Sequence, residues 1–142
     1  MDDQMTSDRI TRKEAVSQQP LSRTFVQEAW DLAVYKKAYK ISLEVHSATK
    51  KFPRDERFEL AGQMRRCSKG ICANLAEGFA KQPFSKAEFK RFIAMAIGSA
   101  AEMQVWSQYA CDLEYISESK ANEWKSVYKD ISRMLQRLHM NV

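Results

Sequence analysis

Apolar residues recur along this chain at intervals of three and four positions, which is the spacing of residues on one face of an α-helix. The clearest stretch lies between Phe52 and Lys81. There one narrow face carries Leu60, Met64, Cys67, Ile71, Leu75 and Gly78. The strongest patterns have this period rather than the alternation of a β-strand, so they predict an all-α protein.

A polar stripe runs beside this apolar face on the same predicted helix. It consists of Gln63, Arg66, Gly70, Asn74 and Glu77. Polar groups at the margin of a core persist only when they are paired. We therefore expect Asn74, Glu77 and either Arg65 or Arg66 to make buried or interfacial hydrogen bonds.

A helix also precedes this stretch, over about residues 30–51. Tyr39 and His46 are expected to widen its buried face. It ends before Pro53, because a residue that precedes proline avoids the α-helical region. Asp55 is then a candidate N-cap for the helix that follows.

Two helices follow the central stretch. Ser85 and Glu88 form the pattern of a capping box at the start of the third helix, which runs to about residue 113. Ser117 is the expected cap of the fourth helix, which continues to the C-terminus. Because short connections make sequential helices antiparallel, we expect an up-down-up-down four-helix bundle.

The third helix is apolar on nearly every side. Between Phe92 and Trp106 its only charged residue is Glu102. Since a helix with this pattern is buried on all sides, we expect Phe92, Met95 and Trp106 to lie at the interface of a homo-oligomer. An unpaired buried carboxylate is costly, so Glu102 is expected to pair with Arg65 or Arg66.

The length of 142 residues suits one domain, with the bundle over residues 29–142 and a polar, flexible arm over residues 1–28. Neither a secretory segment nor a long apolar run is evident, so we expect a cytoplasmic protein without membrane contact. The three cysteines include no C-x-x-C pair, and the two histidines lie far apart in sequence. We therefore expect core cysteines, no metal site and no cofactor.

The positive charge is concentrated in one region. The chain carries a net charge of +5, whereas residues 50–91 hold 11 basic and 5 acidic residues. The bases form two clusters at the predicted helix junctions: Lys50, Lys51, Arg54 and Arg57, then Lys81, Lys86, Lys90 and Arg91. Such an excess indicates a polyanionic partner such as RNA or DNA, with a merely solubilising surface as the alternative.

Several segments resemble a known family. The run FPRDERFELAGQMRRCSKGICANLAEG begins at Phe52, SKAEFKRFIAMAIGSAAEM begins at Ser85, and DLAVYKKAY begins at Asp31. Together they resemble the four helix bundle proteins, small bacterial proteins first noticed as reading frames in intervening sequences of 23S rRNA genes. Gly70 and Cys72 depart from this resemblance, because the family pattern has Ser and Pro there.

The resemblance implies a ring-like homopentamer without enzymatic activity. It extends distantly to the accessory protein of diversity-generating retroelements, a basic pentamer that binds nucleic acid and a reverse transcriptase. The leading hypothesis is therefore a non-catalytic scaffold that contacts nucleic-acid backbones through basic rims. Two alternatives stay open: a module that binds only proteins, and an enzyme that uses Arg66, Asn74, Glu77 and Glu102, although no nucleophile and base pair supports the latter.

Overall fold

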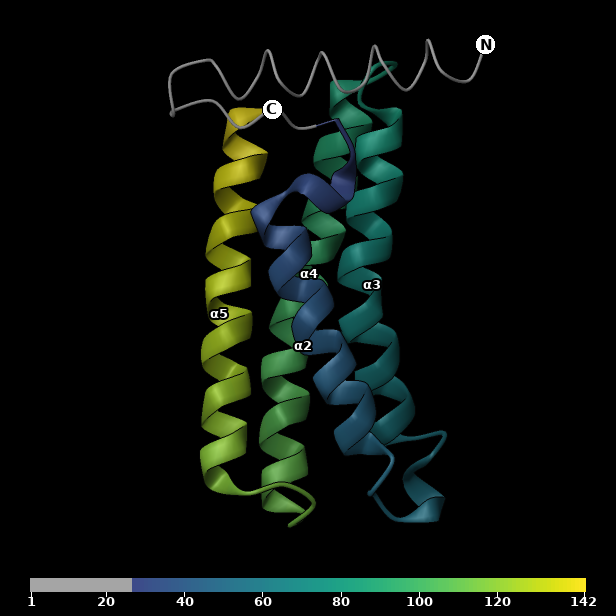
Figure 1. Cartoon of the computed structure of the whole chain (residues 1–142), viewed down its shortest axis with the longest axis vertical. Helices are drawn as coiled ribbons and strands as arrows, with labels where there is room; N and C mark the ends of the chain where they lie inside the picture. The colour runs from purple at the N-terminus through teal and green to yellow at the C-terminus, as the bar shows by residue number, and fades with distance from the viewer. Residues whose placement is uncertain (1–26) are drawn as a thin grey trace, which may run out of the picture.

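A computed structural model describes residues 27–142 of the chain. Four helices run alternately up and down, as Figure 1 shows, and these are α2 (Ala33–Thr49), α3 (Leu60–Lys81), α4 (Lys86–Asp112) and α5 (Glu118–Asn141). Two short 3₁₀ helices, η1 (Ala29–Asp31) and η2 (Arg54–Glu56), flank α2. The predicted all-α bundle is confirmed, whereas the predicted arm over residues 1–28 lies almost wholly outside the described residues.

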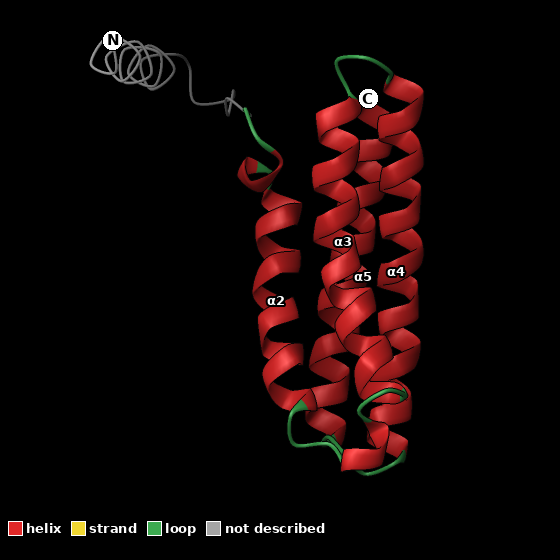
Figure 2. Ribbon diagram, turned by 90° about the vertical axis from the view of Figure 1, so that its right-hand side faces the viewer, coloured by secondary structure: helices red, strands yellow, loops and turns green. Residues whose placement is uncertain are grey.

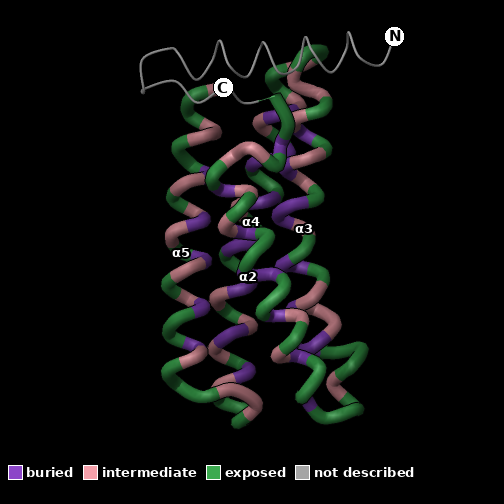
Figure 3. The backbone as a smooth tube through the Cα atoms, in the orientation of Figure 1, coloured by how far each residue is buried: buried purple, intermediate pink, exposed green. Residues whose placement is uncertain are grey.

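Helices α3, α4 and α5 form the compact part of the bundle, and α2 lies at its side (Figure 2). The apolar face predicted for α3 is buried along its whole length. It packs against α4, whose Ile93 and Met103 are fully covered, and it shares one core with the equally covered Trp124 and Leu135 of α5. Buried positions recur along each helix in Figure 3, as expected for amphipathic helices around one core.

Side chains on the outer edge tie α2 to α5. Glu44 accepts hydrogen bonds from Lys120 Nζ at 2.8 Å and from the indole N–H of Trp124 at 3.3 Å. Lys37 pairs with Asp130 at 3.4 Å. Because these ion pairs are solvent-exposed, each contributes little, and the apolar contacts of α2 with α3 carry most of its attachment.

The serine caps lie where the sequence places them. Ser85 Oγ accepts from the backbone N–H of Glu88 at 3.2 Å, and Ser117 Oγ accepts from that of Lys120 at 3.0 Å. The second half of the capping box is replaced, since the Ser85 N–H donates to the carbonyl of Lys81. The Glu88 carboxylate is therefore free to contact basic side chains.

Two helix starts differ from their predictions. Helix α2 begins at Ala33, because the preceding residues form η1. Helix α3 begins at Leu60, and Asp55 lies in η2 instead of capping it. Asp55 lies in a turn because the chain must reverse its direction between the antiparallel helices α2 and α3. Phe52 holds this turn in place: its ring is buried, and the ring centroids of Phe52 and Tyr115 are 5.0 Å apart.

The buried face of α2 is also narrower than expected. Tyr39 is 51% exposed, so its prediction as a core residue is wrong. The face is centred on Ala38, Ile41 and Val45, and Tyr39 lies 100° around the helix from Ala38. His46 is half-buried at the edge of the same face.

Helices α3 and α4 approach each other closely at Gly78. A Cβ atom at this position would lie 2.7 Å from Cβ of Phe92 and 3.1 Å from the ring of Phe89. Only glycine therefore permits α4 to lie this close to the C-terminal end of α3. The edge-to-face contact of Phe79 with Phe89, at 5.9 Å between ring centroids, fills the space beside it.

We predict that Gly78→Ala destabilises the fold by about 1–3 kcal/mol, because α4 must shift to admit the methyl group. Gly70→Ala is the matched control on the same helix, where the nearest atom to an added Cβ is Ser99 Oγ at 3.7 Å. It should stabilise the protein by up to about 1 kcal/mol through helix propensity. Urea unfolding followed by circular dichroism measures both, and equal effects of the two variants would contradict the close-approach explanation.

Candidate nucleic-acid interface

The two basic clusters predicted from the sequence lie at opposite ends of the bundle. Lys50, Lys51, Arg54 and Arg57 surround the α2–α3 connection, while Lys81, Lys86, Lys90 and Arg91 surround the α3–α4 connection. Figure 1 shows these connections at the two ends of the long axis. A single chain therefore presents two separate basic surfaces, as expected for an antiparallel arrangement.

The first cluster surrounds a pocket. This cationic pocket has a volume of about 280 Å³ and lies between the end of α2, η2 and the start of α3. It is lined by Thr49, Lys50, Phe52, Pro53, Arg54, Arg57, Ala61 and Arg65. The lining includes four basic side chains and no acidic one, which makes the pocket suited to an anion.

Arg65 is held in place at the wall of this pocket. Its Nε donates to Thr49 Oγ1 at 2.8 Å, and the Thr49 hydroxyl donates in turn to the carbonyl of His46 at 2.9 Å. Among residues 27–142 none of the four basic side chains of the pocket forms an ion pair. Their charge is therefore available to a ligand.

The pKa of His46, near the C-terminal end of α2, is affected by the neighbouring positive charges. Burial lowers the pKa of its imidazole below the ordinary value of 6.5, and the charges of Lys69, Arg65 and Lys50 lower it further. Its Nδ1 is buried and has no hydrogen-bond partner within the described part of the chain. These features fit a neutral boundary residue of α2 and give the imidazole no catalytic partner.

Two acidic residues of the connection line a different pocket from the cationic one. Glu56 and Glu59 line a separate pocket of about 430 Å³ together with Phe58, Trp106 and Tyr109. The neighbouring carboxylate of Glu56 is the main cause of a raised pKa of Tyr115, a residue of the α4–α5 connection. At the α2–α3 connection, therefore, four basic side chains line one pocket and two carboxylates line another.

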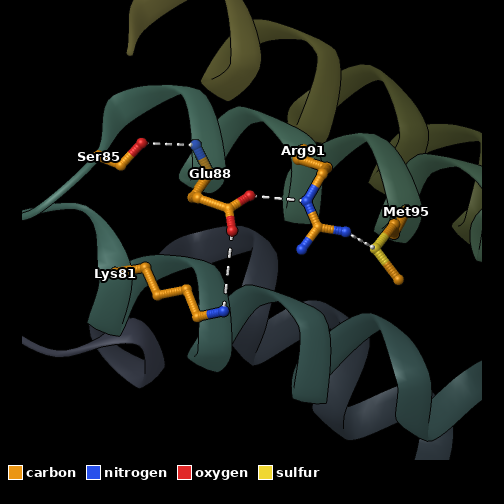
Figure 4. A network of polar contacts seen from close by, with 5 residues as sticks. All are labelled: Lys81, Ser85, Glu88, Arg91 and Met95. Carbon is orange, nitrogen blue, oxygen red and sulfur yellow. Dashed lines mark hydrogen bonds and ion pairs between the residues drawn. The ribbon is translucent and has the colours of Figure 1, made fainter.

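The second basic cluster is partly neutralised, as the network in Figure 4 shows. Glu88 accepts a hydrogen bond from Arg91 Nε at 2.7 Å and pairs with Lys81 Nζ at 4.0 Å. The charged groups of Lys81 and Arg91 lie 4.8 and 4.6 Å from the centroid of the Phe92 ring. Only Lys86 and Lys90 of this cluster are without an ion pair in the described residues.

The expected pairing of Glu102 with an arginine is not found among residues 27–142. Glu102 is exposed and accepts a hydrogen bond from Cys67 Sγ at 2.8 Å. Burial, with this hydrogen bond, raises the pKa of Cys67 to about 11, so the thiol is protonated at neutral pH. The contact therefore supplies no nucleophile for the enzyme hypothesis.

The other members of the predicted polar stripe are scattered. Arg66 and Glu77 are exposed and Asn74 is half-buried, and no side-chain hydrogen bond of theirs is found among the described residues. Arg65 alone turns inward, toward Thr49. The four residues of the hypothetical catalytic set are thus not brought together around a shared hydrogen-bond network.

Comparison with known families decides the identity. Residues 30–137 match the sequence pattern of the family described as 23S rRNA-intervening sequence protein. The chain belongs to this family. A crystal structure of a protein with unknown function from the S23 ribosomal protein family of Bacteroides thetaiotaomicron VPI-5482 has a similar fold, with a TM-score of 0.67 and 21% sequence identity. The similarity covers 75% of this chain and 95% of that chain, and no curated protein matches.

This member of the 23S rRNA-intervening sequence family also exposes apolar residues on α4. Met95, Val105 and Tyr109 are 45–55% exposed. The sequence analysis named Met95 but missed the other two, although their spacing of four residues places them on one face. Trp106 is half-buried, and its buried indole N–H has no partner within residues 27–142.

Phe92 requires a correction. It is 4% exposed within a single chain, because its Cβ lies against Gly78 of α3 and the charged groups of Lys81 and Arg91 lie over its ring. It therefore offers almost no surface to a second copy, contrary to the interface role predicted for it. The sequence could not show this, since the covering contact comes from another helix.

Two further observations bear on the class of protein. No helix within residues 27–142 is both long enough and apolar enough to cross a lipid bilayer. In the same part of the chain, no three His, Cys, Asp or Glu side chains gather in a way that could hold a metal ion.

We predict that Lys69→Gln raises the pKa of His46, because Lys69 is the first among the neighbouring charges that disfavour the imidazolium. The measurement is NMR titration of the imidazole C2 proton. Lys129→Gln on α5 is the control, since Lys129 is not among the charges that act on His46. An unchanged or lowered pKa in Lys69→Gln would show that the charge of Lys69 does not contribute to the shift.

Proposed function

We propose that this protein is a non-catalytic, homo-oligomeric nucleic-acid-binding protein that contacts the phosphate backbone of RNA or DNA. The observation that carries the proposal is the cationic pocket, in which four unpaired basic side chains converge without an acidic neighbour. Lysine and arginine contacts to phosphates supply most of the affinity of sequence-independent binders. Binding by this surface is expected to be micromolar and to weaken steeply with salt.

Oligomerisation makes such a weak surface effective. The exposed apolar side chains Met95, Val105 and Tyr109 of α4 support a homo-oligomer, since exposed apolar surface often marks an interaction site. The family resemblance suggests five copies. Each copy repeats the cationic pocket, and several weak phosphate contacts to one strand add up to a useful affinity.

The proposal includes a role as an accessory to another protein. The resemblance to the accessory protein of diversity-generating retroelements names a reverse transcriptase as one candidate partner. The competing function, a module that binds only proteins, is favoured by the same apolar surface of α4. The two functions differ in whether the isolated, correctly assembled protein binds nucleic acid.

We predict that reversing Lys50, Lys51 and Arg54 to Glu lowers the affinity for RNA and DNA by about tenfold or more at low salt. All three side chains are exposed, so the bundle should stay folded. Reversing Lys129, Arg133 and Arg137, which are exposed on α5, changes the net charge equally and should have a much smaller effect. A double reversal of Lys86 and Lys90 should be intermediate.

Fluorescence anisotropy with labelled RNA and DNA at low and physiological salt provides the test. Equal losses in the α2–α3 and α5 variants would mean that net charge alone is responsible. No binding by the assembled wild-type protein at low salt would reject nucleic-acid binding and leave the protein-interaction module.

We also predict that Met95→Glu and Val105→Glu weaken the oligomer, because each places a charge on the exposed apolar face of α4. Leu43→Glu is the matched control, since Leu43 is 53% exposed on α2, away from that face. Sedimentation equilibrium measures the assembly state. A folded wild-type monomer at micromolar concentration would contradict the proposed oligomer.

A further inference from the structure

The two most exposed large apolar residues in the described chain are both phenylalanines beside basic clusters. Phe58 is 86% exposed at the α2–α3 connection, and Phe84 is 89% exposed at the α3–α4 connection. A ring so exposed contributes almost nothing to the core, and leaving it in water forgoes the stabilisation that its burial would provide. Such a ring is free to contact another molecule.

Only Phe58 is joined to an available cationic site. The guanidinium of Arg57 lies 5.3 Å from the centroid of the Phe58 ring, and Arg57 also lines the cationic pocket. One face of the ring is thus next to a positive charge, while its high exposure leaves the opposite face open. Arg57 links the ring to the cationic pocket, whereas the ring itself lines the second pocket of the connection, which also holds Glu56 and Glu59.

Phe84 has a different environment despite its equal exposure. The nearby Lys81 and Arg91 are engaged by Glu88 and by the ring of Phe92. Among the pockets of the described residues, neither the cationic pocket nor the one that holds Phe58 is lined by Phe84. Phe84 therefore serves as a control, because it is an equally exposed phenylalanine for which no contact with a cationic side chain is found among residues 27–142.

A cationic site beside an open aromatic ring matches the chemistry of a single nucleic-acid strand. A backbone phosphate satisfies the cations, and the unpaired base next to it can stack on the ring, a combination that single-strand binders use without sequence preference. In a duplex, the bases are already stacked and paired, and their faces are not available to a single side chain. The arrangement thus distinguishes strands by their pairing rather than by their sequence.

We infer that the α2–α3 connection is a single-strand binding site, with a phosphate held between Lys50, Arg54, Arg57 and Arg65 and an adjacent base stacked on Phe58. This inference rests on the proposed nucleic-acid binding and makes it more specific, since it names the unpaired strand as the ligand and one side chain as the reader of its bases.

The test compares three labelled ligands of equal length by fluorescence anisotropy: a single strand, the corresponding duplex and an abasic strand that retains the phosphates but lacks bases. Phe58→Ala should weaken binding of the single strand about tenfold and leave binding of the duplex and the abasic strand within about twofold of wild type. Phe84→Ala should change none of the three by more than about twofold. Arg54→Gln should weaken all three, because it removes a phosphate contact.

Thermal unfolding checks that both alanine variants are folded, which their exposure favours. Phe58→Trp gives a second reading, since a larger ring should retain or strengthen binding of the single strand. Equal effects of Phe58→Ala and Phe84→Ala, or an equal loss for strand and duplex, would overturn the inference while leaving nucleic-acid binding in place. Failure of the wild-type protein to bind any of the three ligands would overturn both.

Discussion

The packing of α4 on α3 is the constraint on which the rest of the structure depends. The absence of a side chain at Gly78 lets the two helices lie close together at one end, where a Cβ on residue 78 would lie 2.7 Å from Cβ of Phe92. From there the apolar face of α3 stays in contact with α4 along its length, and α5 completes the core. Helix α2 is added at the side, so the α2–α3 connection projects from the bundle as a separate corner.

This arrangement explains how one helix supports two different surfaces. The inward face of α3 holds Met64, Ile71 and Leu75 in the core. Its neighbouring face turns Arg65 toward Thr49 of α2, and that hydrogen bond gives the cationic pocket a fixed wall. Because α3 is positioned by its core contacts, the pocket needs no rigid loop to keep its shape. The remaining pocket cations come from the connection itself and are free to adapt to a ligand.

Periodicity and capping chemistry were sufficient to predict the four helices, because these signals are local. The buried face of α3 and the caps Ser85 and Ser117 are found as predicted. The start of α3 was placed too early, since Asp55 has the chemistry of a cap but lies in a turn that Phe52 anchors from a distance. Phe92 was misassigned for a similar reason, because the contact that buries it involves a glycine on another helix.

The site was predictable only in its composition. The number of basic residues along the sequence was enough to locate both clusters. No local pattern shows that Glu88 pairs with Lys81 across a turn or that Arg65 donates a hydrogen bond to Thr49. These pairings depend on the tertiary fold. The exposure of Phe58 could have been predicted, because an aromatic residue between two charged residues in a connection between helices has no core to enter. Helical periodicity does not consider residues outside the helices.

The two basic clusters differ in how many of their side chains form ion pairs, so the two ends of the bundle differ in their electrostatic character. At one end the cations converge unpaired, and at the other Glu88 engages two of them. In a closed ring built about a single rotation axis, all copies point the same way. When the helices run along that axis, such a ring has two chemically distinct faces, one that attracts a polyanion and one that attracts it less. A strand bound to the first face leaves the second exposed, so a ring of identical chains can hold two unlike partners at once.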